Sequence, residues 1–287
     1  MIWENLFLPF YDYAFMRRAL YGCIAISVSA TPIGVFLILR RMSLTGDAIA
    51  CAILPGAAIG YLVSGLSLGS MTIGGVVAGL TVALLSGLVS RITALREDAS
   101  LAAFYIISLA LGVVIVSTRG SNIDLMHILF GTVLALDNPT LTLLSTITTL
   151  STITLVIFFR PLVLECVDPL FLRSVSRMST ITHFTFLSLV VLNLVGGFHA
   201  LGTLMAVGIM ILPAAGARFW AVSLGGLITI AFVIATLSSL FGLLLSFNFS
   251  LPSGPAIILV AGTAYLLSLA FGSVDGIVTK SIRKSLL

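Results

Sequence analysis

The chain has 287 residues, of which 59% are hydrophobic and 8% are charged, and its mean hydropathy is +1.23. Soluble domains contain about 25% charged residues, so the composition excludes an ordinary soluble protein and predicts an all-α polytopic integral membrane protein. The formal net charge of +4 does not indicate a nucleic-acid partner, because the cations lie between apolar segments and serve as topology signals.

Residues 1–16 are rich in aromatic side chains and lack both a basic start and a small-residue cleavage site. We therefore expect no signal peptide, and interpret this stretch as an interfacial segment that leads into the first span. Residues 1–287 then form a single transmembrane domain with about nine helices. Their approximate ranges are 20–39, 44–63, 70–90, 101–118, 139–159, 182–198, 201–217, 220–246 and 254–272.

The basic residues predict the orientation of these spans. Eleven of the 14 lie in alternate connections or at the C-terminus: Arg40, Arg41, Arg91, Arg96, Arg160, Arg173, Arg177, Arg218, Lys280, Arg283 and Lys284. Arg17, Arg18 and Arg119 lie on the other side. The positive-inside rule makes the larger set cytoplasmic, which places the N-terminus outside, the C-terminus inside, and favours an odd number of spans.

The stretch from Arg40 to Gly56 carries a carboxylate into an apolar segment. Asp47 and Cys51 are four residues apart and share one helix face. Pro55 leaves the carbonyl of Cys51 without its helical donor, so a carboxylate, a thiol and a carbonyl could together bind a cation. Two other interpretations stay open: Asp47 could complement the helix dipole, and Cys51 could be a small apolar filler. As a metal site, the mixed pair leans slightly to zinc over manganese.

Glycines in the same stretch predict close helix contacts. Gly56 and Gly60 are four residues apart, a spacing that lets two membrane helices approach each other. Together with a kink at Pro55, this surface would allow the helix to move.

Other ionisable residues are weaker candidates. Asp124 and His127 share a helix face and could bind or hand over a metal, although a solvated interfacial pair fits equally well. We expect His183 to be interfacial, and Glu97 with Asp98 to cap the fourth span. Cys23, Cys51 and Cys166 are far apart and show no metal-finger or disulfide pattern.

Residues 160–180 form a long connection of mixed charge. Asp168 followed by Pro169 is a helix-start signal, and the residues that follow could form a short amphipathic helix with Leu170, Phe171, Leu172 and Val175 on its apolar face. Such a helix could rest on the membrane surface or dock into a soluble partner.

Sequence motifs exclude several activities. The chain contains no G-x-x-x-x-G-K-[ST] phosphate loop, no H-E-x-x-H and no G-x-S-x-G. It is therefore not expected to be an enzyme, and any ATP hydrolysis must occur in a separate subunit.

Three blocks resemble the integral membrane permeases of ABC transporters for zinc, manganese and iron. They are Gly34–Ala48 running on to Leu54-Pro55-Gly56, then Glu97-Asp98-Ala99 with His127–Gly131, and finally Leu201–Val207 continuing to Leu212–Ala215. The resemblance covers essentially the whole chain. It implies the fold of a type II ABC importer permease in a bacterial inner membrane.

The resemblance also implies partners and site residues. It predicts a homodimer or a pair of related permeases, two cytoplasmic ATPases that dock on Asp168, Pro169, Leu170, Phe171 and Arg173, and an extracytoplasmic metal-binding protein. Asp47 corresponds to a ligand of the metal pathway, while Cys51 stands where the family usually has histidine.

The cargo implied is zinc first and manganese second, with no permanently bound cofactor, since the Met16–Leu20 start and the Ala200–Met205 block look most like a zinc-uptake branch. An ATPase-independent secondary cation transporter is the alternative, although we find no internal repeat of the kind such carriers show. A membrane scaffold without transport activity would leave Asp47 unexplained.

Overall fold

The structure is a computed structural model that describes residues 10–64, 67–93, 97–118, 136–168, 178–274 and 276–277. Helices are the main regular elements in these ranges, which contain no strand. They are α2 (Ala14–Leu39), α3 (Thr45–Ser64), α4 (Leu68–Ile92), α5 (Glu97–Thr118), α7 (Asn138–Ile157), α8 (Phe159–Val167), α10 (Met178–Leu201), α11 (Thr203–Ala217), α12 (Leu224–Phe249) and α13 (Ser253–Phe271).

Each of the nine predicted spans corresponds to one of these helices, and the all-α membrane fold is confirmed. Eight helices in the described ranges are long and apolar enough to cross a membrane, and α11 is a shorter apolar helix. The predicted ends are less accurate than the spans. Helix α10 begins at Met178 rather than near residue 182, because Ser179 and Thr182 are buried inside the bundle although hydropathy scores them as polar.

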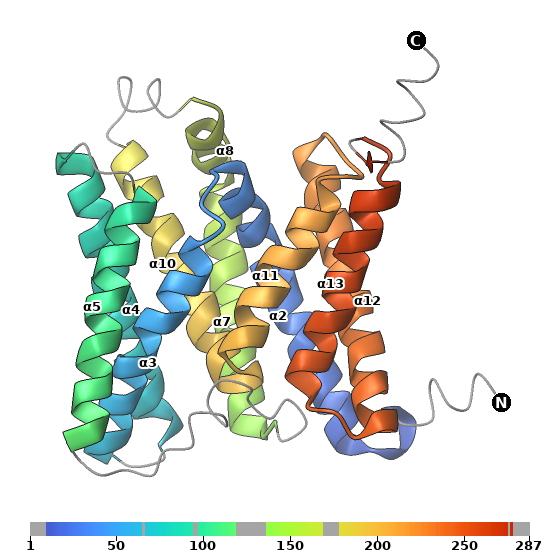
Figure 1. Cartoon of the computed structure of the whole chain (residues 1–287), viewed down its shortest axis with the longest axis horizontal. Coiled ribbons are helices and arrows are strands. Elements are labelled where there is room, and N and C mark those ends of the chain that lie inside the picture. Colours follow the sequence, from blue (N-terminus) through green and yellow to red (C-terminus); the bar gives the residue numbers. More distant parts are fainter. Residues whose placement is uncertain are drawn as a thin grey trace.

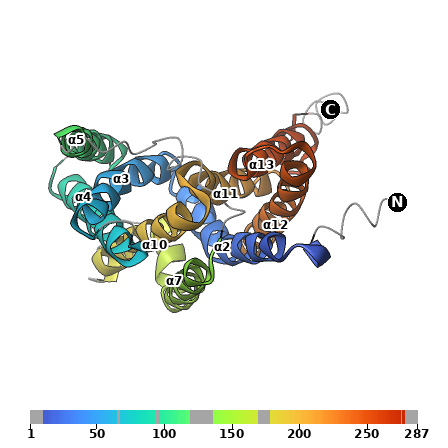
Figure 2. The same ribbon diagram turned by 90° about the horizontal axis from the view of Figure 1, so that it is seen from below.

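The helices run side by side, and α2 begins at the lower end of the bundle while α13 ends at the upper end (Figure 1). Viewed along the bundle, α2, α10 and α11 lie in the middle, with α5 at one edge and α12 and α13 at the other (Figure 2). Burial agrees with this arrangement: 72% of the apolar window of α10 is buried, against 17% for α5. The outer helices therefore present apolar faces outward.

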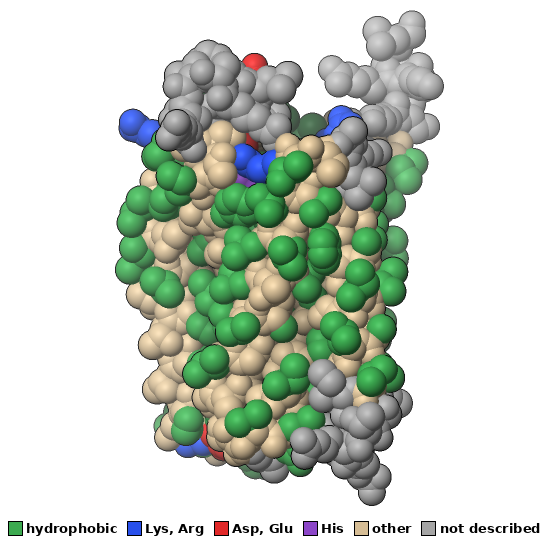
Figure 3. Space-filling model, turned by 90° about the vertical axis from the view of Figure 1, so that its left-hand side faces the viewer, with side chains coloured by type: hydrophobic (Ala, Val, Ile, Leu, Met, Phe, Trp, Pro, Cys, Tyr) green, Lys and Arg blue, Asp and Glu red, His purple; other side chains and the backbone are tan. Residues whose placement is uncertain are grey.

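Charge is absent from the middle of the face shown in Figure 3, where hydrophobic and uncharged side chains cover the surface between two charged ends. Even the Ser- and Thr-rich α7 fits this pattern. Its exposed hydroxyls donate to carbonyls of their own helix, as Thr142 does to Pro139 at 2.8 Å and Thr149 to Ser145 at 2.7 Å. A hydroxyl with an internal acceptor costs less in hydrocarbon than an unpaired one.

A single residue separates α10 from α11. Gly202 has φ 86° and ψ 160°, a conformation that is strained for residues with a Cβ atom. At 1.5 Å per residue, the 15 residues of α11 extend about 22 Å, less than the thickness of a bilayer core. The chain thus reverses abruptly at Gly202, and α11 starts inside the bundle beside α3.

The contact between α3 and α4 depends on glycine. A methyl group added at Gly56 would overlap the carbonyl oxygen of Gly74, and one added at Gly60 would overlap the carbonyl oxygen of Ser70. The two backbones therefore touch directly. Contacts of this kind stabilise helix pairs in lipid through van der Waals packing rather than through the hydrophobic effect.

We predict that Gly56→Ala lowers the stability of the purified protein by on the order of 1–3 kcal/mol, the usual cost of overpacking. The matched control is Gly262→Ala on α13, where an added methyl group meets no atom within 4 Å. Thermal unfolding in detergent should show a lower midpoint for Gly56→Ala only. Equal midpoints for the two variants would contradict the packing assigned to Gly56.

Candidate metal-binding groove and a buried ion network

A groove of about 350 Å³ lies between α3, α11 and α13. Asp47, Cys51 and Leu54 are on its α3 side. The wall contributed by α11 and α13 is almost entirely apolar: Thr203, Leu204, Val207, Gly208, Ile211, Leu212 and Ile258. The carboxylate and the thiol are therefore the only groups among these lining residues with strong affinity for a metal cation.

The turn before α3 positions Asp47. Helix α2 ends in a Schellman motif, in which the N–H of Met42 bonds to the carbonyl of Leu37 at 2.9 Å and the N–H of Arg41 to that of Ile38 at 3.1 Å. Arg41 occupies the left-handed position, with φ 59°, where glycine is usual. Met42 is buried beneath the turn. Its burial and the two backbone hydrogen bonds together constrain the direction in which the chain enters α3.

Close packing against α11 holds the first turn of α3 in place. A methyl group added at Gly46 would lie 2.8 Å from Cε of Met210 and 3.4 Å from Cδ1 of Ile211. Asp47 follows in the first helical turn with its side chain exposed in the isolated chain, while Cys51 is half-buried. The carboxylate thus sits both at a helix N-terminus, where the dipole favours it, and at the mouth of the groove.

The predicted sharing of one helix face holds for Asp47 and Cys51, which both line the groove. The side chain of Pro55, whose predicted role was only to free the carbonyl of Cys51, points in another direction. Pro55 is buried and faces α5, where a methyl group added at Gly112 would lie 2.5 Å from its Cβ. The reason is helix geometry. Four residues rotate a side chain by about 40° beyond a full turn, and eight residues by about 80°.

Two ligands do not complete a metal site. No group of three or more His, Cys, Asp or Glu side chains within the described residues is placed to hold a metal ion. Asp124 and His127 lie outside the described residues. A cation at Asp47 and Cys51 would therefore need further ligands of another kind, such as backbone carbonyls, water or groups from another chain.

The predicted coupling residues Pro169, Leu170, Phe171 and Arg173 also lie outside the described part of the chain. Asp168 is described and ends α8, with its N–H bonded to the carbonyl of Leu164 at 2.9 Å. The described part of the 160–180 connection contains the short helix α8, which ends just before Asp168. The residues predicted to form a helix after Asp168 lie outside the described part of the chain.

The structure shows a buried ion network that the sequence did not suggest. Glu165 of α8 lies 2.7 Å from Nη2 of Arg40 at the end of α2, and 3.8 Å from Nη2 of Arg91 in α4. His183 of α10 is 3.8 Å from Glu165 through Nδ1 and 3.1 Å from Glu97 of α5 through Nε2. Five helices are therefore joined by one set of charges.

Neighbouring groups help to compensate this burial. The side chains of Arg40 and Glu165 are only 7% and 6% exposed. The Arg40 guanidinium lies 4.6 Å from the ring centroid of Phe186, and Arg91 donates to Oγ1 of Thr180 at 2.7 Å. Burial of paired charges is tolerated when each has such partners.

Sequence reasoning did not foresee the partners in this region. His183 is buried inside the chain, at 6% exposure. Glu97 lies in the first turn of α5, as expected, and also pairs with His183. A signal was nevertheless present. Glu165 is an isolated carboxylate in the apolar run from Leu162 to Val167, where an ionisable residue needs a partner.

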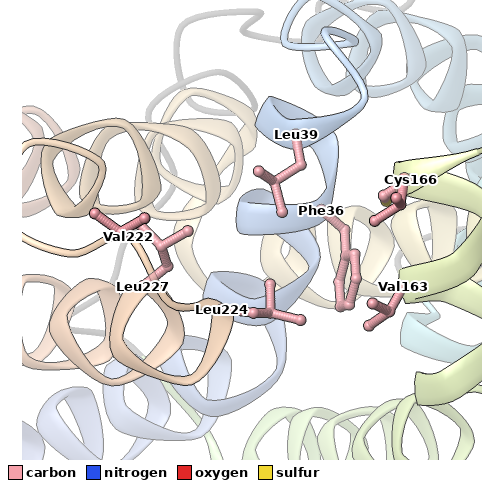
Figure 4. Close-up of a pocket in the computed structure, with 8 residues that line it drawn as sticks. Phe36, Leu39, Val163, Cys166, Val222, Leu224 and Leu227 are labelled. Atoms are coloured by element: carbon pink, nitrogen blue, oxygen red, sulfur yellow. The ribbon is translucent and has the colours of Figure 1, made fainter.

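An apolar pocket of about 190 Å³ lies beside the network, between α2, α8 and the start of α12. Phe36 and Leu39 face Val163 and Cys166 across it, and Leu224 approaches from the opposite side (Figure 4). Burial raises the pKa of the Cys166 thiol, and the positive charge of Arg40 partly opposes this shift. Cys166 is thus kept as a neutral thiol of the pocket wall.

Comparison with known proteins identifies the family. A model of the ABC 3 transport family matches residues 12–272. The manganese transport system membrane protein MntC of Halalkalibacterium halodurans is 32% identical over 270 residues, covering 94% of this chain and 91% of that protein. The manganese import system permease protein ScaB of Streptococcus parasanguinis is 31% identical over 257 residues, covering 90% of each chain.

A solved structure agrees with these sequence relatives. The chain matches PsaBC from Streptococcus pneumoniae, determined in complex with a Fab, with a TM-score of 0.83 and 28% identity over 99% of this chain and 100% of that one. Similarity therefore extends over all the helices described above, including those that form the groove and the ion network. The chain belongs to the ABC 3 transport family.

Proposed function

We propose that this protein is the permease subunit of an ATP-driven ABC importer in a bacterial plasma membrane, and that its cargo is Mn²⁺. The observation that carries the proposal is the groove with Asp47 and Cys51, in a chain whose relatives over about nine-tenths of its length are named manganese transport proteins. In this proposal the cation passes through the groove and is bound at Asp47.

The proposed orientation places α8 on the cytoplasmic side. Arginine side chains of the described residues are more prominent near the upper end than near the lower end in Figure 3, which agrees with the positive-inside rule. In this arrangement two ATPase subunits dock on the 160–180 connection, and an extracytoplasmic metal-binding protein delivers the cation at the opposite end. The C-terminal end of α8 suits such docking because it continues directly into Asp168, the first of the predicted coupling residues.

A second permease chain completes the metal site in this proposal. Asp47 is exposed on the isolated chain, and an exposed carboxylate beside apolar helices would be costly in lipid. Pairing of two copies along the groove would cover this face and could double the number of ligands. A second chain identical to the first and one that is only related to it would both cover this face.

The zinc preference expected from the sequence is not supported by the relatives, which are named for manganese. Carboxylate ligands suit Mn²⁺, whereas a thiolate favours softer cations. Cys51 is thus the residue through which this chain could depart from a manganese preference. A secondary transporter that works without ATPase subunits is a poorer fit, because the relatives are components of transport systems and the chain belongs to an ABC family.

We predict that Asp47→Asn abolishes manganese uptake by cells that express the complete transporter. The amide keeps the size of the side chain but removes the charge that binds the cation. Uptake of radioactive Mn²⁺ should fall by on the order of 100-fold or more, since losing even an outer-shell partner of a metal ligand costs about 10- to 100-fold in affinity or activity. Asp98→Asn, at the start of α5, is the control and should retain uptake. Wild-type uptake by Asp47→Asn would exclude Asp47 from the pathway.

We also predict that Cys51→His changes which metal is transported. Imidazole is a harder ligand than a thiolate, so the variant should discriminate more strongly against Zn²⁺ in competition with Mn²⁺. Cys51→Ser controls for loss of the thiol alone. The measurement is the ratio of the two metals accumulated by cells from an equimolar mixture. An unchanged ratio in both variants would show that Cys51 does not contact the cargo.

A further inference from the structure

Glu165 connects the short helix α8 to the helices that surround it. It is the sole acidic residue of α8 and contacts residues of α2, α4 and α10. Because both Glu165 and Arg40 are almost completely buried, their interaction is screened by solvent and salt far less than a surface ion pair. A displacement of α8 therefore acts on Arg40 directly.

Arg40 in turn precedes the metal-binding stretch. It is the C-cap of α2, and the Schellman turn through Arg41 and Met42 leads into α3, where Asp47 lies in the first turn. The turn is held by two backbone hydrogen bonds and by burial of Met42. It should consequently move as a unit with Arg40 instead of absorbing the displacement.

The surroundings leave α8 room to move. The apolar pocket of about 190 Å³ separates part of α8 from the start of α12, so α8 is not packed tightly on that side (Figure 4). Firm attachment to α2 on one side and open space on the other is the arrangement expected of an element that transmits a displacement.

We propose that Glu165 is a positioning residue that couples α8 to the metal-binding stretch through its ion pair with Arg40. This inference rests on the proposed function. ATPase docking displaces α8, and the Glu165–Arg40 pair carries the displacement to the end of α2. The turn that follows then reorients Asp47 in the groove. Arg91 and His183 hold the other side of the Glu165 carboxylate and define its resting position.

The test uses the complete transporter in proteoliposomes, with Mn²⁺-loaded binding protein on one side and ATP on the other. The measured quantity is the number of Mn²⁺ ions transported per ATP hydrolysed. The main variant is the double substitution Arg40→Met with Glu165→Leu, because replacing both members of a buried ion pair by apolar residues commonly preserves folding. Glu165→Gln is the second variant, and it keeps the size of the side chain.

The matched control is Arg218→Gln, which removes an exposed arginine charge at the end of α11, outside the 160–180 connection. The proposal expects both test variants to assemble and hydrolyse ATP while transporting about tenfold fewer ions per ATP, a typical coupling magnitude. Arg218→Gln should keep the wild-type ratio.

Two outcomes would overturn the proposal. The first is a transport ratio in the double variant within about twofold of the wild type, which is below a typical coupling effect. The second is a parallel loss of assembly, hydrolysis and transport in both test variants, since that would make the ion pair a purely structural anchor. Failure of the proposed function is separately visible, because the wild-type transporter itself would then carry no Mn²⁺.

Discussion

The cost of placing charge in an apolar environment governs this structure. Only 8% of the residues are charged, and charged side chains are confined to the two ends of the face shown in Figure 3. Among the described residues, the deeply buried Glu165 is matched by Arg40 and Arg91, and Glu97 is matched by His183. This requirement brings the ends of α2, α4, α5, α8 and α10 to one place, because each carries a group that needs a partner from another helix.

Backbone contact is the second constraint, since lipid supplies no hydrophobic driving force between helices. Small residues let α3 touch α4 at Gly56 and α11 at Gly46. The same α3 also packs against α5 at Pro55, while its remaining side lines the groove with Asp47 and Cys51. Gly202 alone separates α10 from α11, and the reversal there places α11 along the groove. The small residues that allow the helices to pack closely therefore also shape the groove.

The ion network and the groove lie at opposite ends of one short stretch of chain. Arg40 belongs to the ion network and Asp47 to the groove, and between them lies a turn with a left-handed arginine. Such a residue is retained at a cost in backbone strain. Its position suggests why the region from Arg40 to Gly56 combines cations, a carboxylate and glycines: it has to satisfy buried charge, a defined turn and close packing within a few residues.

The sequence by itself determined the class of fold, the nine apolar spans and the pairing of Asp47 with Cys51 on one face, because each of these follows from hydropathy and helical period. It also carried the family resemblance, which was confirmed. It did not determine which helix covers Pro55, because the position of α5 beside α3 is set by packing, or which metal is carried, since ligand types overlap between metals. Only the tertiary structure decided that His183, Glu97, Arg40 and Glu165 meet. They are distant in sequence, and each could have been solvated at the membrane surface. Packing of the helices excludes that water, so the charged groups pair with one another.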